Sequence, residues 1–177
     1  MARQKVEAMA QAILHRHGLD SRPIFIERIV EAEGIRLIRT TFEDKLAGVS
    51  GALYIDQQGP VIICNSEHHP HRQRFTIAHE LGHFFLNGKS RNAVFVDKQP
   101  MVRLRNDRSE AGVDPEEIDA NAFAAALLMP KQLVLADVTQ YMEQNLSSSG
   151  EIAESLAAEY KVSAQAMALR LHALGVI

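Results

Sequence analysis

The residues from His79 to His83 spell H-E-L-G-H, an H-E-x-x-H motif, inside an apolar run from Phe75 to Leu86. Such a run predicts a helix that is buried on most sides. On a helix of about 3.6 residues per turn, His79 and His83 leave the same face, so both imidazoles can bind one metal ion. Glu80 then lies beside that ion, where it can take a proton from a metal-bound water. The motif therefore predicts a metal-dependent hydrolase.

The alternative is a helix that carries these residues by chance, because H-E-x-x-H also occurs in unrelated chains. The apolar surroundings argue against chance. Buried polar side chains need partners, and a metal ion with its water would supply partners for all three.

A third metal ligand is expected elsewhere, since catalytic zinc sites usually have three protein ligands and one open position. The stretch Glu116–Pro130 is rich in alanine and leucine, begins with acidic residues and stops at a proline, which predicts a helix. Glu117 and Asn121 are four residues apart and share one face of it. Ala120 and Ala124 beside them are small enough to let this helix pack closely on the motif helix.

We therefore predict Glu117 as the third ligand, ahead of Glu116 and Asp119. Asn121 is predicted to hydrogen-bond a ligand histidine and so orient its ring. The alternative is that the three acids only complement the helix dipole.

The chain resembles the ImmA/IrrE family of metallo-endopeptidases, which are gluzincin-like and zinc-dependent. The resemblance rests on the strand-like Ile62–Asn65, RQRFTIAHELGH at Arg72–His83, E-x-x-A-N at Glu117–Asn121 and FAAALLMP at Phe123–Pro130. It implies one zinc ion, or another divalent metal, held by His79, His83 and Glu117, with Glu80 as catalytic base. It also implies a protein substrate, often a helix-turn-helix transcriptional repressor, whose cleavage would release silenced genes in stress responses or mobile elements.

Composition limits the other classes of function. A chain of 177 residues suits one compact domain with a small appended subdomain, and its net charge of -3 gives no case for a dedicated nucleic-acid or membrane binder. The only cysteine, Cys64, follows three apolar residues and is most simply a core residue. No signal-peptide core or span of about 20 apolar residues is present, so we expect a cytoplasmic protein.

Apolar periodicity predicts an α+β fold, mainly helical, with a small three-stranded twisted sheet packed on the motif helix. Helices are expected from Val6 toward Gly18 and from Ser21 toward Gly34. Strands are expected at Ile35–Arg39, Val49–Ile55 and Val61–Cys64. Val49–Ile55 is the candidate edge strand that could bind a substrate backbone, its alternative being an ordinary strand without a ligand role.

Two further segments carry polar side chains. His68, His69 and His71 precede the motif helix, but Pro70 interrupts them, so a surface loop is preferred over a second metal site. Asn87–Pro115 is charged and without a sustained period, which favours a solvated loop, with a strand at Met101–Leu104 as one option and a wall of the substrate cleft as the functional alternative. Four residues are candidates for stabilising an oxyanion or contacting substrate, and the sequence does not choose among them: Tyr54, His71, Arg72 and Arg74.

The chain changes character after Pro130, and we expect a metallopeptidase domain at 1–130 and a helical subdomain packed on it at 131–177. A helix from Lys131 to about Gln144 and a linker at Ser147–Gly150 precede two helices, Glu151–Tyr160 and Ser163–Leu174, with Ser163 as N-cap. This pair resembles a helix-turn-helix. However, acids outnumber bases from Lys131 onward, and phosphate contacts dominate DNA affinity, so we expect packing or partner docking without direct DNA binding.

Two functions from different classes fit these residues. The first is a zinc endopeptidase that cleaves a regulatory protein such as a repressor. The second is a non-catalytic, metal-binding regulatory module that docks a transcription regulator through its C-terminal helices. The intact His79, Glu80 and His83 favour the first, because a structural zinc site is closed by four ligands and needs no glutamate base.

Overall fold

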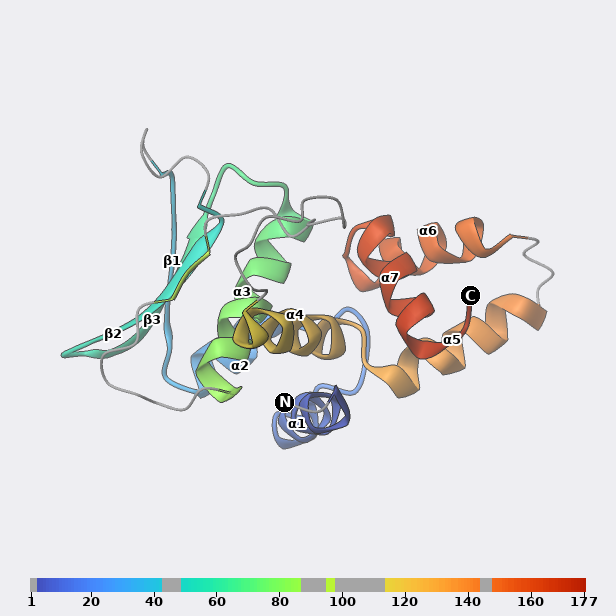
Figure 1. The fold of residues 1–177 in the computed structure, drawn as a ribbon, viewed down its shortest axis with the longest axis horizontal. Helices are drawn as coiled ribbons and strands as arrows, with labels where there is room; N and C mark the ends of the chain where they lie inside the picture. The colour runs from blue at the N-terminus through green and yellow to red at the C-terminus, as the bar shows by residue number, and fades with distance from the viewer. Residues whose placement is uncertain (1–2, 43–48, 87–94, 98–113, 144–147) are drawn as a thin grey trace.

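The structure is a computed structural model, and it describes residues 3–42, 49–86, 95–97, 114–143 and 148–177. Its helices all lie on one side of a small sheet (Figure 1), and the α+β class predicted from the sequence is confirmed. The elements in chain order are α1 (Arg3–Arg16), α2 (Ile26–Ala32), β1 (Arg36–Thr40), β2 (Gly51–Asp56), β3 (Gly59–Asn65), α3 (Pro70–Leu86), β4 (Phe95–Asp97), α4 (Pro115–Leu128), α5 (Lys131–Glu143), α6 (Ser149–Tyr160) and α7 (Ala164–Leu174).

The sheet has the strand order β1-β3-β2-β4. Strands β2 and β3 form an antiparallel hairpin in which Gly51 pairs with Cys64 and Leu53 with Ile62. Strand β1 runs parallel to β3, with Leu37 opposite Ile62. The three predicted strands are present, with their ends shifted by one or two residues.

Strand β4 was not predicted, and it corrects the assignment of the sheet edge. It pairs antiparallel with β2 from Gly51 to Leu53, so the candidate edge strand Val49–Ile55 is an inner strand over that part. Strand β4 lies within Asn87–Pro115, a segment for which the sequence pattern favoured a loop. The rest of that segment up to residue 113, including the optional strand Met101–Leu104, lies outside the described residues.

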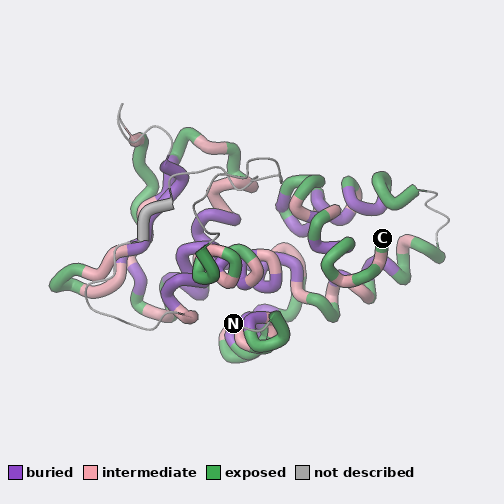
Figure 2. The backbone as a smooth tube through the Cα atoms, viewed as in Figure 1, coloured by how far each residue is buried: buried purple, intermediate pink, exposed green. Residues whose placement is uncertain are grey.

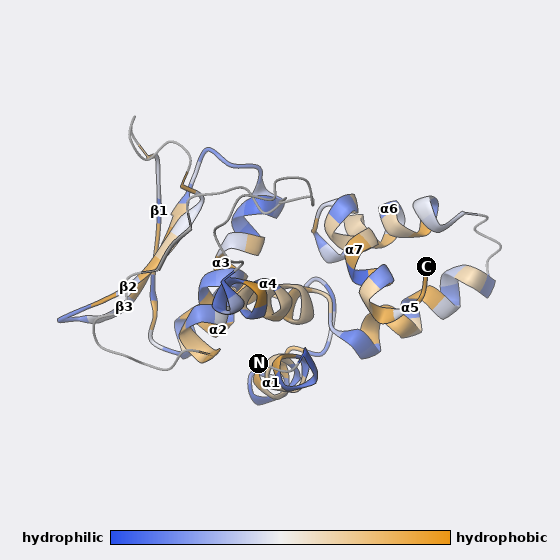
Figure 3. Cartoon of the chain, in the orientation of Figure 1, coloured by the Kyte–Doolittle hydropathy of each residue, from blue (hydrophilic) through white to orange (hydrophobic). Residues whose placement is uncertain are grey.

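Helix α3 lies between the sheet and α4 (Figure 1). Because side chains alternate along a strand, Leu53, Ile62 and Cys64 share the sheet face that packs against it, and all three are buried. Figure 2 shows the buried residues concentrated where α1, α3 and α4 face one another. Figure 3 colours much of α4 apolar, but α3 also carries hydrophilic residues in the buried region, because His79, Glu80 and His83 are buried there.

Helix α3 begins at Pro70, before the apolar run that predicted it. Proline suits the first position of a helix because its missing N–H would have no partner there in any case. The expected loop is present at His68 and His69, which precede the helix, but the expectation is wrong for His71, which lies in the first turn of α3.

Capping side chains mark the starts of the last two helices. The Ser163 side chain accepts from the Ala166 amide at the start of α7, which confirms this N-cap. Helix α6 starts earlier than predicted, because Ser148 and Glu151 form a capping box that draws the expected linker residues Ser149 and Gly150 into the helix.

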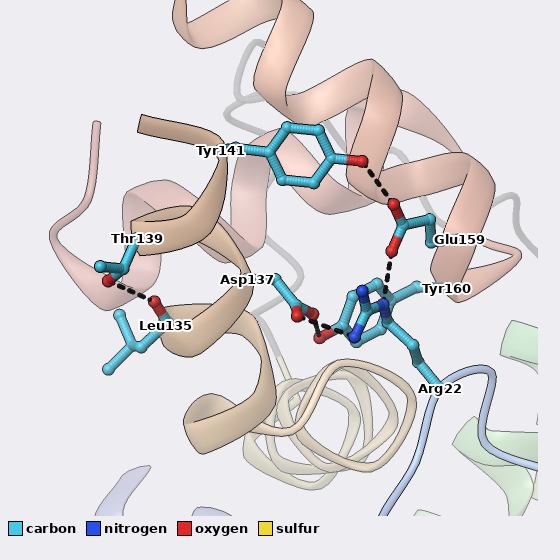
Figure 4. A network of polar contacts seen from close by, with 7 residues as sticks. All are labelled: Arg22, Leu135, Asp137, Thr139, Tyr141, Glu159 and Tyr160. Carbon is cyan, nitrogen blue, oxygen red and sulfur yellow. Dashed lines mark hydrogen bonds and ion pairs between the residues drawn. The ribbon is translucent and has the colours of Figure 1, made fainter. Parts of the chain in front are cut away.

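A polar network joins α5 and α6 to the connection between α1 and α2 (Figure 4). Arg22 contacts Asp137 at 2.8 Å and Glu159 at 2.5 Å. Tyr160 donates to Asp137 at 2.5 Å, and Tyr141 donates to Glu159. A single cluster of buried apolar residues also includes side chains from both 1–130 and 131–177. The division into two domains at residue 130 stays a prediction.

None of the described helices is by itself long and apolar enough to cross a membrane. Helices α4 and α5 meet that requirement only as a pair, and the pair is bent by 54°. Six of the 14 residues of α4 are buried within this fold, and the helix contacts α1 and α3.

Candidate metal centre

The two histidines of the H-E-x-x-H motif point the same way from α3. His79 and His83 are 2% and 1% exposed, and their Nε2 atoms lie 3.0 Å apart. Four-residue spacing on a helix brings the two rings together, as expected from the sequence. Their ring edges meet at nearly a right angle, with centroids 4.6 Å apart.

Glu117 reaches the same point from α4. Its Oε2 lies 3.3 Å from Nε2 of His79, and its Oε1 lies 3.1 Å from Nε2 of His83. The imidazoles of His79 and then His83 hold the pKa of the Glu117 carboxyl far below its usual value, so it is a carboxylate. The Glu117 side chain is 42% exposed, so the cluster is buried on the α3 side and opens to solvent on the α4 side.

This donor set fits a small divalent cation. Zinc bound tetrahedrally at 2.0 to 2.2 Å has ligand atoms separated by about 3.3 Å, and the three separations between side chains here are 3.0, 3.1 and 3.3 Å. Two imidazoles with one carboxylate also match a catalytic zinc site with one open position. Among the described residues, these three form the group of His, Cys, Asp and Glu side chains that can hold a metal.

Asn121 supports the first histidine. Its Oδ1 lies 3.0 Å from Nδ1 of His79, one helical turn after Glu117 on the same face of α4. A carbonyl oxygen here accepts the Nδ1 proton, which leaves the Nε2 lone pair of His79 directed at the cluster. The structure thus shows the predicted contact between Asn121 and His79, while the roles of the two residues at a metal stay predictions.

Glu80 is fully buried between α3 and the start of β2. A Cβ atom added to Gly51 would lie 3.6 Å from its Oε1, so the carboxylate lies beside the strand backbone. The Glu80 carboxylate is thus buried, and Glu80 directly follows His79 in the chain.

The closeness of α3 and α4 depends on a residue that the sequence reasoning missed. A Cβ atom on Gly82 would lie 3.0 Å from the Cα and the carbonyl oxygen of Ala120. Ala120 and Ala124 are both buried, in keeping with the close packing expected of them. The signal was present in the motif itself, because Gly82 is the small residue facing that alanine.

The structure does not gather the four oxyanion candidates at this centre. Tyr54 follows Leu53 on β2, so it lies on the opposite sheet face from the one that packs on α3. Arg74 donates to the carbonyl oxygens of Ile24 and Lys161.

The other two candidates lie in the first turn of α3, away from the metal-binding cluster. His71 contacts the ring of His69, and burial lowers its pKa. Arg72 donates to Ser50 Oγ at 2.8 Å. None of the four belongs to the group formed by His79, His83 and Glu117, and their roles as oxyanion or substrate contacts stay predictions.

A cavity of about 710 Å³ lies elsewhere, between α1 and the junction of α4 and α5. Leu14, Leu19 and Leu133 contribute apolar walls, and Glu7 and Lys131 are among its charged residues. His79, His83 and Glu117 are not among its lining residues, so this cavity is separate from the candidate metal centre.

The family described as the IrrE N-terminal-like domain matches residues 31–172. The chain belongs to this family. The match extends from α2 through the motif helix and α4 into α7, so it includes His79, His83 and Glu117.

Two curated relatives are named radiation response metalloprotease IrrE. The protein from Deinococcus deserti is 39% identical over 79 residues, which are 45% of this chain and 26% of the relative. The protein from Deinococcus radiodurans is 31% identical over 111 residues, which are 62% of this chain and 30% of the relative. The matches therefore span less than a third of these relatives. Their names identify a family of metalloproteases, which implies a divalent metal.

Proposed function

We propose that the protein is a zinc-dependent endopeptidase with His79, His83 and Glu117 as metal ligands and Glu80 as general base. The observation that carries this proposal is the convergence of the three ligand side chains, whose donor atoms all lie within 4.8 Å of one another. Membership in a metalloprotease family supports the same conclusion. The two imidazoles and single carboxylate match the donor set of two histidines and one glutamate found in catalytic zinc sites.

A bound zinc ion would supply Lewis-acid chemistry, lowering the pKa of water and polarising the carbonyl of the scissile peptide. The protein residues then divide the remaining work. Asn121 keeps His79 in the tautomer that presents Nε2. Glu80 accepts a proton at its carboxylate and later delivers it to the leaving amine. Burial of Glu80 keeps bulk water from competing for that proton.

We propose a regulatory protein as substrate, in particular a helix-turn-helix transcriptional repressor. This follows from the resemblance to ImmA/IrrE endopeptidases, and the radiation-response relatives support a role in a stress response. A repressor is found with the DNA it controls, so the proposed place of action is the cytoplasm. Transcription of the repressed genes would rise when the repressor is cut.

Direct DNA binding by the C-terminal pair is not part of this proposal. Arg170 is the only Lys or Arg of α7, and its guanidinium is buried. It binds both carboxylate oxygens of Glu7 at 2.9 and 2.6 Å and donates to the Met129 carbonyl. A base already committed to these internal contacts is not available to a DNA phosphate.

The test compares the zinc-loaded protein with Glu80→Gln, using a library of peptides from a digested cell lysate as substrate. Mass spectrometry of new peptide ends reports cleavage, and elemental analysis reports bound zinc. We expect Glu80→Gln to keep about one zinc per chain and to lose activity by about 10²- to 10⁴-fold, the usual contribution of a general base. Glu31→Gln, the same change at an exposed position of α2, is the matched control and should cleave normally.

Equal cleavage by Glu80→Gln and the unchanged protein would remove Glu80 from the mechanism. A wild-type protein that binds zinc but produces no new peptide ends would favour the non-catalytic regulatory module instead.

A further inference from the structure

One face of α3 connects the metal centre to the start of β2. Arg72, Thr76 and Glu80 are spaced four residues apart and therefore lie in a row along the helix. This row faces Ser50 and Gly51, the residues at which β2 begins. Arg72 is about 12 Å along the axis from Glu80, so the two side chains do not touch, and the start of β2 contacts both ends of the row.

Arg72 holds the strand at one point. Its Nη2 donates to Oγ of Ser50 at 2.8 Å, and Ser50 is only 2% exposed. The far side of the same segment is tied to β3, where the Asn65 amide donates to the Ser50 carbonyl at 2.9 Å and Asn65 Nδ2 donates to the Val49 carbonyl at 3.4 Å. Residues 49–50 are thus fixed between α3 and the end of β3.

Gly51 is the next residue, and it packs directly on α3. A Cβ atom at this position would overlap Thr76 Cγ2, would lie 2.8 Å from the Ile63 carbonyl oxygen and would come within 3.6 Å of Glu80 Oε1. No other residue type fits there without moving the strand or the helix. The backbone at Gly51 therefore forms one wall of the space that holds the Glu80 carboxylate.

We propose that Arg72 and Ser50 are positioning residues, whose hydrogen bond holds Gly51 against α3 and thereby fixes the Glu80 carboxylate beside the metal-binding cluster. This inference rests on the proposed function in one respect, that Glu80 accepts a proton from a ligand of the metal. Arg72 and Ser50 touch neither metal nor substrate and act only through the strand. Loss of their hydrogen bond should therefore leave the metal content unchanged but weaken the acceptance of a proton by Glu80.

The experiment uses cobalt-loaded protein and acetohydroxamic acid as probe, with binding followed by the visible absorption of cobalt. A hydroxamate chelates the metal and presents a proton that a well-placed Glu80 can accept. One such hydrogen bond is worth about 1.4 kcal/mol, so we expect Ser50→Ala and Arg72→Gln to weaken binding by about tenfold, in the same direction as Glu80→Gln. Arg72→Lys retains a donor and should recover part of the affinity.

Ser163→Ala is the matched control, since it also removes one serine hydroxyl that accepts a hydrogen bond, but at the N-cap of α7. We expect it to lower stability and to leave hydroxamate affinity unchanged. With any peptide that the zinc-loaded protein cleaves, Ser50→Ala should lower kcat with little change in KM, because substrate contacts are untouched.

The outcomes separate this inference from the proposed function. Wild-type affinity for the hydroxamate in both Ser50→Ala and Arg72→Gln, with Glu80→Gln weakened, would overturn the positioning role alone. A protein that cleaves no peptide but shows the expected hydroxamate pattern would fail as a peptidase while retaining the positioning role. Failure to bind cobalt, or unchanged affinity in Glu80→Gln, would overturn the inference outright.

Discussion

The backbone of Ala120 occupies the position that a side chain on Gly82 would require. An added Cβ would lie 3.0 Å from both the Cα and the carbonyl oxygen of Ala120. Gly82 lies between the two motif histidines, His79 and His83, and Ala120 lies between Glu117 and Asn121. The absence of a side chain at Gly82 therefore allows close packing of the two helices that carry the candidate metal ligands.

Gly82→Ala should destabilise the protein and weaken metal binding together. The methyl group forces α4 away from α3, and overpacking of this kind costs about 1 to 3 kcal/mol. Moving α4 also withdraws Glu117 from the imidazoles. Urea unfolding would measure the loss of stability, and titration with zinc would measure the loss of affinity.

The control for this substitution is Gly150→Ala in the first turn of α6, where the nearest atom to an added Cβ is Ser148 Oγ at 4.0 Å. Alanine there should raise stability by about 0.4 to 1 kcal/mol, because it restricts the unfolded chain without a clash. A Gly82→Ala protein as stable as the unchanged one would show that the helices do not need this contact.

The arrangement of the candidate metal centre followed from local spacing. His79 and His83 share a face because they are four residues apart, and the same rule pairs Glu117 with Asn121. Small residues on α4 indicated which helices could approach closely. These rules act within one helix or between two apolar faces, so a sequence pattern carries them. The functional roles of the residues stay predictions.

The remaining features depend on contacts between distant segments. Strand β4 makes β2 an inner strand at Gly51–Leu53, and the hydrogen bonding of β2 to residues 95–97 has no local signature. The role of Gly51 is likewise visible only when Thr76 and Glu80 are placed against it. Tyr54 is a similar case, since strand alternation assigns it a face only once the face toward α3 is known.

Asn121→Ala should lower zinc affinity by about 10- to 100-fold, the usual cost of removing the hydrogen-bond partner of a ligand histidine. The Nδ1 atom of His79 would lose its acceptor at 3.0 Å, and the ring would no longer be held in one orientation. Competition with a chromogenic chelator would measure the affinity. Asn121→Asp keeps an acceptor oxygen at the same position and should retain most of it. Equal affinity in the alanine variant would exclude Asn121 from the support of His79.

Cys64 should make the protein less stable at alkaline pH. Its thiol is fully buried between β3 and α3, and burial raises its pKa from 9.0 to about 11, with a smaller contribution from the charge of Glu80. The folded protein therefore holds this proton more tightly than the unfolded chain does. The resulting stability is present below about pH 9 and is lost as the pH rises toward 11.

The predicted loss between pH 8 and pH 10 is about 1 kcal/mol from this group. Other side chains also titrate in this range, so the measurement is the difference between the unchanged protein and Cys64→Ala, each unfolded by urea at both pH values. The variant should be less stable at pH 8, because it leaves a small cavity beside Leu53 and Ile62, but it should lose about 1 kcal/mol less on going to pH 10. The same decline in both proteins would place the alkaline sensitivity in another group and would show that the Cys64 thiol ionises as easily in the folded chain as in the unfolded one.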